Sequence, residues 1–210
     1  IGFQAFDRST DSNNSYGEDF PFLGLSTVSA TSANFSVSET RFEERSYGLF
    51  GEQQFAFSDM FYVTVGARAD AHSAFGDSAD LQFYPKIDAS YLISEHSFWN
   101  NDIGSLRLRG SYGTAGMQPG AFDAVRTWSP ISAIGAVPAV TPGNVGNPDL
   151  RPEVSHEYEA GFEFSTLSDR LNIDFTYYNQ RTKDALHSRG LPPSLGFTGT
   201  QLENIGEVAN

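Results

Sequence analysis

Three carboxylates that fall on one side of an extended chain are the first residues in this sequence that could carry chemistry. They are Glu157, Glu159 and Glu163, within the stretch from Gly146 to Phe164 (GNPDLRPEVSHEYEAGFEF). A pair of carboxylates can divide acid and base work between them in glycoside hydrolysis. Alternate residues of an extended chain share one face, however, and like charges on one face repel without acquiring separate roles. We therefore interpret the glutamates as a water-facing surface and expect no enzyme.

Metal chemistry has one partial candidate near the N-terminus. Asp7, Ser9, Asp11 and Glu18 match several positions of a twelve-residue calcium loop, although Ser12 stands where that loop needs glycine. No helices are expected beside it. The four histidines, at positions 72, 96, 156 and 187, are scattered and form no metal-binding spacing. The expectation is that the chain holds no metal and no cofactor.

Aromatic residues in irregular, glycine-rich and proline-rich segments are the candidates for ligand contact. Phe122, Trp128 and Phe197 lie in such segments. Their rings suit stacking on sugars or peptides. They would serve equally well to pack the loops together, and the sequence leaves these two roles open.

The composition excludes several classes of protein. The chain has 210 residues with 26 acidic and 13 basic side chains, a formal net charge of -13, so nucleic acid is not an expected partner. Cysteine is absent, which removes disulfides and thiolate metal sites. No stretch approaches the roughly 18 consecutive apolar residues of a spanning helix. Many aromatic residues and glycines favour strands and turns.

Alternation of apolar and polar residues supplies the elements that must position these side chains. It predicts six strands, over 47–57, 61–70, 81–93, 106–113, 156–165 and 171–180. The first 45 residues are mostly loop-like, a loop is expected over 72–80, and long irregular segments follow the fourth and sixth strands. The strand lengths are close to the roughly 9–11 residues that cross a bilayer at a tilt. A soluble β-sandwich would show the same alternation, so the pattern leaves the environment of the apolar face open.

Two features favour a membrane barrel over a sandwich. The polar faces carry mixed charges among small residues, as a wet interior requires, and aromatic residues gather near strand ends, as at membrane interfaces. Arg107 and Arg109 are expected to offset the glutamates across that interior. The predicted interior-facing residues are Arg68, Lys86, Asp88, Arg107, Arg109, Glu157, Glu159, Glu163 and Asp174.

Two consecutive stretches resemble a known family. NPDLRPEVSHEYEAGFEF (147–164) and DRLNIDFTYYNQRTKDAL (169–186) are similar to the C-terminal half of TonB-dependent outer-membrane transporter barrels, especially the SusC/RagA-like branch. Four further stretches fit in the expected order: SYGLFGEQQFAFSDMFYVTVGARAD (46–70), QFYPKIDASYLISE (82–95), LRLRGSYGTAGMQ (106–118) and NIGEVAN (204–210). The segment DAHSAFG (70–76) departs from the family's usual Asp-Gly-Ser-Ser-Arg-Phe-Gly run, and Tyr91 stands where tryptophan is common.

The resemblance implies an all-β, antiparallel transmembrane barrel segment, an internal or C-terminal-half piece of an about 22-stranded barrel, with no plug domain in this chain. It implies active uptake of a glycan, peptide or chelate across the bacterial outer membrane. The partners would be outer-membrane lipid, the TonB complex through regions absent from this chain, and a SusD-like surface lipoprotein. A soluble glycan-binding β-sandwich and a passive porin are the alternatives.

The resemblance also divides the chain. Residues 1–45 would be an extracellular loop region with a partial strand. Residues 46–182 would hold the barrel strands, with a long extracellular loop over 114–155. Residues 183–210 would form an extracellular loop that leads to a next strand.

Overall fold

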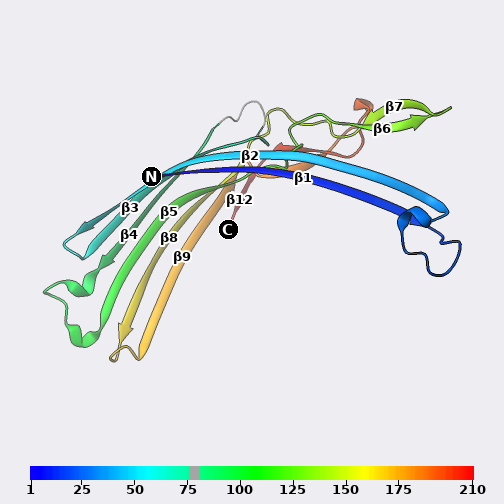
Figure 1. Cartoon of the computed structure of the whole chain (residues 1–210). Helices are drawn as coiled ribbons and strands as arrows, with labels where there is room; N and C mark the ends of the chain where they lie inside the picture. Colours follow the sequence, from blue (N-terminus) through cyan, green and yellow to red (C-terminus); the bar gives the residue numbers. More distant parts are fainter. Residues whose placement is uncertain (76–80) are drawn as a thin grey trace.

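A curved antiparallel sheet of eight strands dominates the structure, a computed structural model that describes residues 1–75 and 81–210 (Figure 1). Its spatial order is β1-β2-β3-β4-β5-β8-β9-β12. The strands are β1 (Gly2–Glu18), β2 (Ala33–Phe57), β3 (Phe61–His72), β4 (Gln82–Leu92), β5 (Ser105–Met117), β8 (Glu153–Thr166), β9 (Leu171–Lys183) and β12 (Glu207–Ala209). Neighbours in the sheet are neighbours along the chain, except where a small hairpin is inserted before β8 and before β12.

The inserted hairpins and four short turns of 3-10 helix complete the secondary structure. The hairpins are β6 (Trp128–Ala133) with β7 (Val137–Pro142), and β10 (Leu186–Gly190) with β11 (Thr200–Asn204). The 3-10 turns are η1 (Val28–Ala30), η2 (Ile93–Glu95), η3 (Asn101–Ile103) and η4 (Pro193–Leu195). In the part of the chain that the structure describes, no helix has the length and apolar character needed to span a membrane.

Connections at the two ends of the strands differ in length. One end carries the tight turns 58–60 and 167–170 together with the connection 93–104. The other end carries the segments 19–32, 118–152 and 184–206, and residues 73–75 after β3. Of the predicted loop 72–80, His72 is the last residue of β3, and residues 76–80 lie outside the described ranges. The tight turn after β2 places Ser58 and Asp59 at φ values of 53° and 55°, the left-handed conformation that tight hairpins require.

Residues 1–45 are largely strand, and the prediction that they are mostly loop is wrong. Residues 2–16 of β1 pair in continuous register with residues 36–50 of β2. Between Tyr47 and the tip of the hairpin near residues 18–33, polar side chains predominate on both faces, so this part shows no apolar alternation. Cross-strand ion pairs hold it instead: Arg45 lies 3.2 Å from Asp7, and Arg8 lies 3.6 Å from Glu44. The backbone ladder, which no sequence pattern reports here, makes the strand.

Two other predicted loops also contain ordered structure. The predicted loop 114–155 begins inside β5, holds the β6–β7 hairpin and ends inside β8. The predicted loop 183–210 holds the β10–β11 hairpin and the short edge strand β12. Trp128 to Pro142 carries no charged residue and several β-branched ones, yet its strands are too short for alternation to reveal them.

The sheet is one layer thick, and its apolar face is uncovered. Leu49, Phe55, Ile87 and Phe175 on that face are all exposed to the surroundings. Among the described residues the buried hydrophobic side chains are Ala74, Leu150 and Phe197, which lie at the long-loop end instead of on the sheet. Burial of apolar area, the main favourable term in folding, is therefore missing from this face unless an apolar environment supplies it.

Candidate functional site

A cluster of ion pairs crosses β5, β8 and β9 on the polar face of the sheet. Arg107 stands directly opposite Glu163 in the strand register and forms an ion pair with it. Arg109 reaches Glu163 at 3.1 Å and Asp174 at 2.6 Å, and its Nη2 also donates to the Thr176 hydroxyl at 2.5 Å. These side chains are partly exposed, so each pair contributes at most about 1 kcal/mol, but the shared partners hold one another in place. The cluster gives this face a fixed arrangement of charge.

The expectation that Arg107 and Arg109 offset the glutamates across an interior is wrong for Glu163. The two arginines and Glu163 lie on adjacent strands, because the antiparallel register places residue 107 beside residue 163. The same register pairs Ser111 with Asp88 on one side and with Glu159 on the other. Ser111 is two residues past Arg109 along β5, so these two carboxylates lie beside the serine and not beside an arginine. Among the described residues, Asp88, Glu157 and Glu159 have no ion-pair partner, and Glu159 accepts a hydrogen bond from Ser111 at 3.3 Å.

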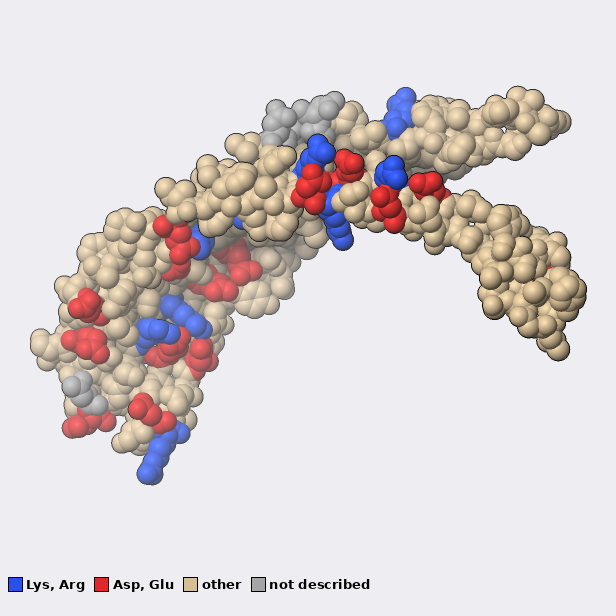
Figure 2. All heavy atoms as spheres, in the orientation of Figure 1, with Lys and Arg blue, Asp and Glu red and all other residues tan. Residues whose placement is uncertain are grey.

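Glycines on the same face make room for the remaining charged side chains. Lys86 of β4 reaches across β3 to an ion pair with Glu52 of β2. It passes over Gly66, where an added Cβ would lie 2.8 Å from the lysine Cε. Gly48 likewise leaves the space that the Arg68–Asp70 pair fills, at 2.6 Å. Figure 2 shows the acidic and basic side chains gathered along this face. Glu52 also belongs to this charged face, but it was not among the interior-facing residues predicted from the sequence.

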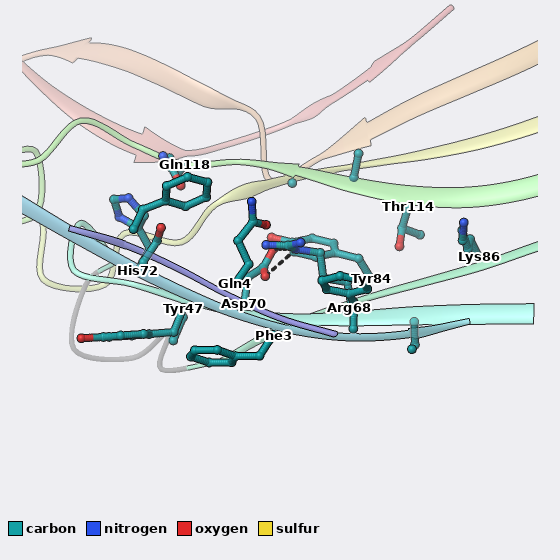
Figure 3. Close-up of a pocket in the computed structure, with 18 of the residues that line it drawn as sticks. Phe3, Gln4, Tyr47, Arg68, Asp70, His72, Tyr84, Lys86, Thr114 and Gln118 are labelled. Carbon is teal, nitrogen blue, oxygen red and sulfur yellow. Dashed lines mark hydrogen bonds and ion pairs between the residues drawn. The ribbon is translucent and has the colours of Figure 1, made fainter. Parts of the chain in front are cut away.

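A cavity of about 870 Å³ opens beside the Arg68–Asp70 pair near the long-loop end. Figure 3 shows Gln4, Arg68, Asp70 and Tyr84 pointing to one side of the sheet, while Tyr47 and Phe3 point to the other. The residues that line the cavity come from β1, β2, β3 and β4 and from the end of β5. This hollow is where the polar face meets the long loops.

We expect Gly161→Ala to lower the free energy of unfolding by about 1–3 kcal/mol, because overpacking in a tight site forces backbone shifts. A Cβ at Gly161 would overlap the Phe175 carbonyl oxygen of β9 and lie 3.2 Å from Arg109 Nε. The matched control is Gly113→Ala on the same face, where no atom lies within 4 Å, and it should change stability by less than about 0.5 kcal/mol. Denaturant unfolding of the full-length protein in lipid vesicles measures both. Equal losses would contradict the packing account.

Aromatic side chains rim the apolar face at the tight-turn end. Phe57 packs on Phe61 with ring centroids 6.1 Å apart, and Phe61 meets Tyr91 edge to face at 5.9 Å. Tyr91 in turn contacts His96, and Trp99 Nε1 donates to the Gly104 carbonyl oxygen at 2.7 Å. A row of aromatic rings that includes the amphipathic Tyr91 suits the boundary between hydrocarbon and water.

The partial calcium candidate is not assembled. Asp7, Ser9 and Asp11 alternate along the extended strand β1, which separates alternate residues by roughly 6.5 Å and forms no ligand loop. Asp7 and Asp11 instead pair with Arg45 and Arg41. Glu18 accepts hydrogen bonds from the Tyr16 hydroxyl and the Asn34 amide, which hold the pKa of its carboxyl below the usual value. No group of three or more His, Asp or Glu side chains in the described ranges is placed to hold a metal ion.

Two of the three loop aromatics come together. Trp128 and Phe197 have ring centroids 5.6 Å apart, although they belong to different loops, and the Arg126 guanidinium lies over the Phe197 ring at 5.6 Å. Phe122 instead packs edge to face on Phe42 of β2 at 6.3 Å. Arg126 was absent from the predicted site, because a single arginine in an irregular segment has no pattern to mark it.

The two long loops are joined into one body. Asn147 donates to the Leu202 carbonyl oxygen at 3.0 Å, and Gln201 donates to that of Gly146 at 2.6 Å. Asn204 donates to the Arg151 carbonyl oxygen at 2.7 Å and accepts from the Arg151 backbone N–H at 2.8 Å. Leu150 is completely buried at this junction. The segments 118–152 and 184–206 therefore form a shared platform above the sheet.

A single curved sheet with an uncovered apolar face, an aromatic rim and an ion-paired polar face is the wall of a transmembrane β-barrel. The chain belongs to the TonB dependent receptor-like, beta-barrel family, whose family model matches residues 2–210. It is thus part of a bacterial outer-membrane protein, and the predicted fold class is confirmed. The family that matches is a barrel family, and the soluble β-sandwich alternative is not the one it supports.

Curated relatives of the chain are TonB-dependent receptors. TonB-dependent receptor P26 of Formosa agariphila is 32% identical over 169 residues, which cover 77% of this chain and 17% of that protein. TonB-dependent receptor SusC of Bacteroides thetaiotaomicron is 24% identical over 173 residues, again 77% of this chain and 17% of that protein. The chain therefore spans about a sixth of the length of these relatives.

Solved structures agree on the fold. The RagAB peptide transporter superposes with a TM-score of 0.88 at 20% identity, over 99% of this chain and 24% of that chain. The siderophore receptor PirA from Pseudomonas aeruginosa superposes with a TM-score of 0.58 at 18% identity, over 83% of this chain and 32% of that chain. The predicted family, the TonB-dependent receptors, is confirmed, and SusC and the RagAB transporter are among the proteins that this chain resembles.

Proposed function

We propose that the full-length protein is a TonB-dependent transporter, not an enzyme, that takes up a nutrient across the outer membrane. The observation that carries this proposal is the division of the wall into an apolar outer face and a polar inner face with fixed ion pairs. The candidate interior residues Arg68, Lys86, Asp88 and Asp174 would line the path with the other charged residues of that face. Energy would come from the TonB complex through parts of the protein outside these 210 residues.

The ends of the strands suggest the orientation. Barrels of this class combine short periplasmic turns with longer external loops, so the end with turns 58–60 and 167–170 would face the periplasm. The β1–β2 hairpin tip and the loop platform 118–152 with 184–206 would then stand outside the cell. Ligand contact would come from this platform, where Trp128 and Phe197 meet and where Phe122 lies in the first loop.

A surface lipoprotein of the SusD type is the proposed partner on the external side. The support is the relation to SusC and the fold shared with the RagAB peptide transporter. The glycan, peptide or chelate carried by this protein is an open choice among the cargo classes of the family.

Uptake experiments in the native bacterium test the proposal. Deletion of the gene should abolish growth on one nutrient from a panel of glycans, peptides and iron chelates, and the full-length gene should restore it. Accumulation of that labelled nutrient should stop when a protonophore dissipates the proton gradient. Accumulation that continues under the protonophore would identify a passive porin and overturn the proposal. Growth of the deletion strain on every member of the panel would also contradict it.

A further inference from the structure

We propose that Arg126, mounted on Phe197 beside Trp128, binds a carboxylate of the imported ligand and makes the transporter select acidic ligands. This inference rests on the proposed function, because it assigns a ligand class to the external platform. The carboxylate could belong to a sugar acid or to an acidic peptide, which share the same chemistry at this site.

The guanidinium of Arg126 is held by an aromatic base and left open on its outer side. Phe197 is only 7% exposed and forms the base, with the Arg126 carbon Cζ 5.6 Å from its ring centroid. Arg126 Nε makes one long hydrogen bond, to the Val145 carbonyl oxygen at 3.4 Å. Because no acceptor for the two terminal nitrogens is found among residues 1–75 and 81–210, these nitrogens remain for an external acceptor. A planar guanidinium presents them in the fork that receives a carboxylate through two parallel hydrogen bonds.

Charge pairing elsewhere in the chain sets Arg126 apart. Of the 13 Lys and Arg side chains, only Arg126, Arg170 and Lys183 lack a carboxylate oxygen within 4.0 Å in the described ranges. Arg170 lies in a tight turn at the opposite end of the sheet, and Lys183 ends the spanning strand β9. Acidic residues outnumber basic ones by two to one, 26 to 13, so a loop cation without a carboxylate partner in the described ranges is unusual here. Of these three cations in the described ranges, Arg126 is the one that lacks a carboxylate partner and also lies over an aromatic ring.

The backbone around Arg126 is fixed by both loops. Gly146 has a φ of 69° and lies so close to Val125 and Arg126 that a Cβ would overlap their peptide group. The Gln201 side chain holds the Gly146 carbonyl oxygen from the second loop at 2.6 Å. Asn144 donates to the Phe122 carbonyl oxygen at 2.9 Å and accepts from the Thr127 N–H at 2.8 Å. A cation held by such contacts loses little conformational freedom when it binds, which favours affinity.

The surface beside Arg126 indicates which chemical groups should accompany the carboxylate of the ligand. Trp128 is 52% exposed, and no residue from Thr127 to Pro148 is charged. An exposed indole offers its face to the C–H surface of a sugar ring or to an apolar side chain. A ligand with a carboxylate next to a flat apolar face therefore fits both groups at once. A neutral ligand would use only the indole.

Binding measurements on the purified full-length protein in detergent test this inference. The probes are an oligogalacturonate with the matching neutral oligogalactoside, and the tripeptide triglutamate with triglutamine. In at least one pair the acidic probe should bind about tenfold or more tightly than its neutral partner. Arg126→Ala should remove that preference without changing affinity for the neutral probe, and Arg126→Lys should restore only part of it. Trp128→Ala should weaken both members of the pair.

Matched controls separate ligand recognition from folding. Arg170→Ala removes another unpaired arginine at the opposite end and should leave binding unchanged. Equal affinities within both pairs, no binding of any probe, or an equal effect of Arg126→Ala on acidic and neutral probes would overturn the inference. Energised uptake without an Arg126-dependent preference would refute only this site. A preference for acid without energised uptake would refute the proposed transport and leave the site standing.

Discussion

Replacing Ala160 with arginine should lower the free energy of unfolding of the full-length barrel in lipid by about 2–4 kcal/mol, the cost of a cation at the bilayer midplane on a barrel's lipid face. Ala160 lies in the middle of β8, between Tyr158 and Phe162 on the apolar face, and its register partners are Gly110 and Tyr177. The nearest charged side chains are on the other side of the sheet. An arginine here would have hydrocarbon as its only surroundings.

Ser111→Arg is the matched control on the opposite face. Ser111 stands in register between Asp88 and Glu159, neither of which has an ion-pair partner among the described residues. The new guanidinium would meet water and two carboxylates, so stability should change by less than about 0.5 kcal/mol. Guanidinium chloride unfolding in vesicles of matching thickness, followed by tryptophan fluorescence, measures both variants. A loss for Ser111→Arg as large as that for Ala160→Arg would show that the faces are assigned wrongly.

Gly104→Ala should cost about 2–5 kcal/mol, the sum of backbone strain and a steric overlap. Gly104 has a φ of 118°, and its carbonyl oxygen accepts the hydrogen bond from Trp99. A Cβ at this position would overlap the Ser165 carbonyl oxygen at the end of β8. The substitution therefore strains the connection before β5 and pushes apart the β5–β8 pair at the aromatic rim.

Gly199→Ala isolates the strain from the overlap. Gly199 has a similar φ of 109°, but no atom lies within 4 Å of its virtual Cβ. Its substitution should cost about 1–3 kcal/mol, from backbone strain alone. The same unfolding assay and the fraction of protein folded into vesicles compare the two variants. If Gly104→Ala were no worse than Gly199→Ala, the close approach of β5 and β8 at this point would be disproved.

Alternation in the sequence was sufficient for the membrane-spanning part of the sheet. It predicted strands where β3, β4, β5, β8 and β9 occur, and it placed Arg107 and Glu163 on polar faces opposite the aromatic ones. Each strand there has one face toward lipid and one toward water, so apolar and polar residues alternate with a period of two. Strands β3, β5, β8 and β9 are a few residues longer than predicted, because pairing continues past the last alternating position, whereas β4 is one residue shorter at each end.

The same reasoning failed where both faces meet water. The outer half of the β1–β2 hairpin is held by its backbone ladder and by pairs such as Arg41 with Asp11, and polar residues predominate on both of its sides. The platform depends on Asn147, Gln201 and Asn204, amides that bond to backbone 53 to 55 residues away. Neither arrangement has a period in the sequence.

The order of residues within each strand therefore decided which side chains share a face, because alternate residues of an extended strand point to the same side. Register and loop packing decided the rest, because they join residues that are far apart in sequence. They matched Arg107 and Arg109 with Glu163 on the neighbouring strand, and they left Asp88 outside every ion pair of the described residues. They also brought Phe197 from one loop beneath Arg126 of another, which turned an ordinary loop arginine into the candidate anion site.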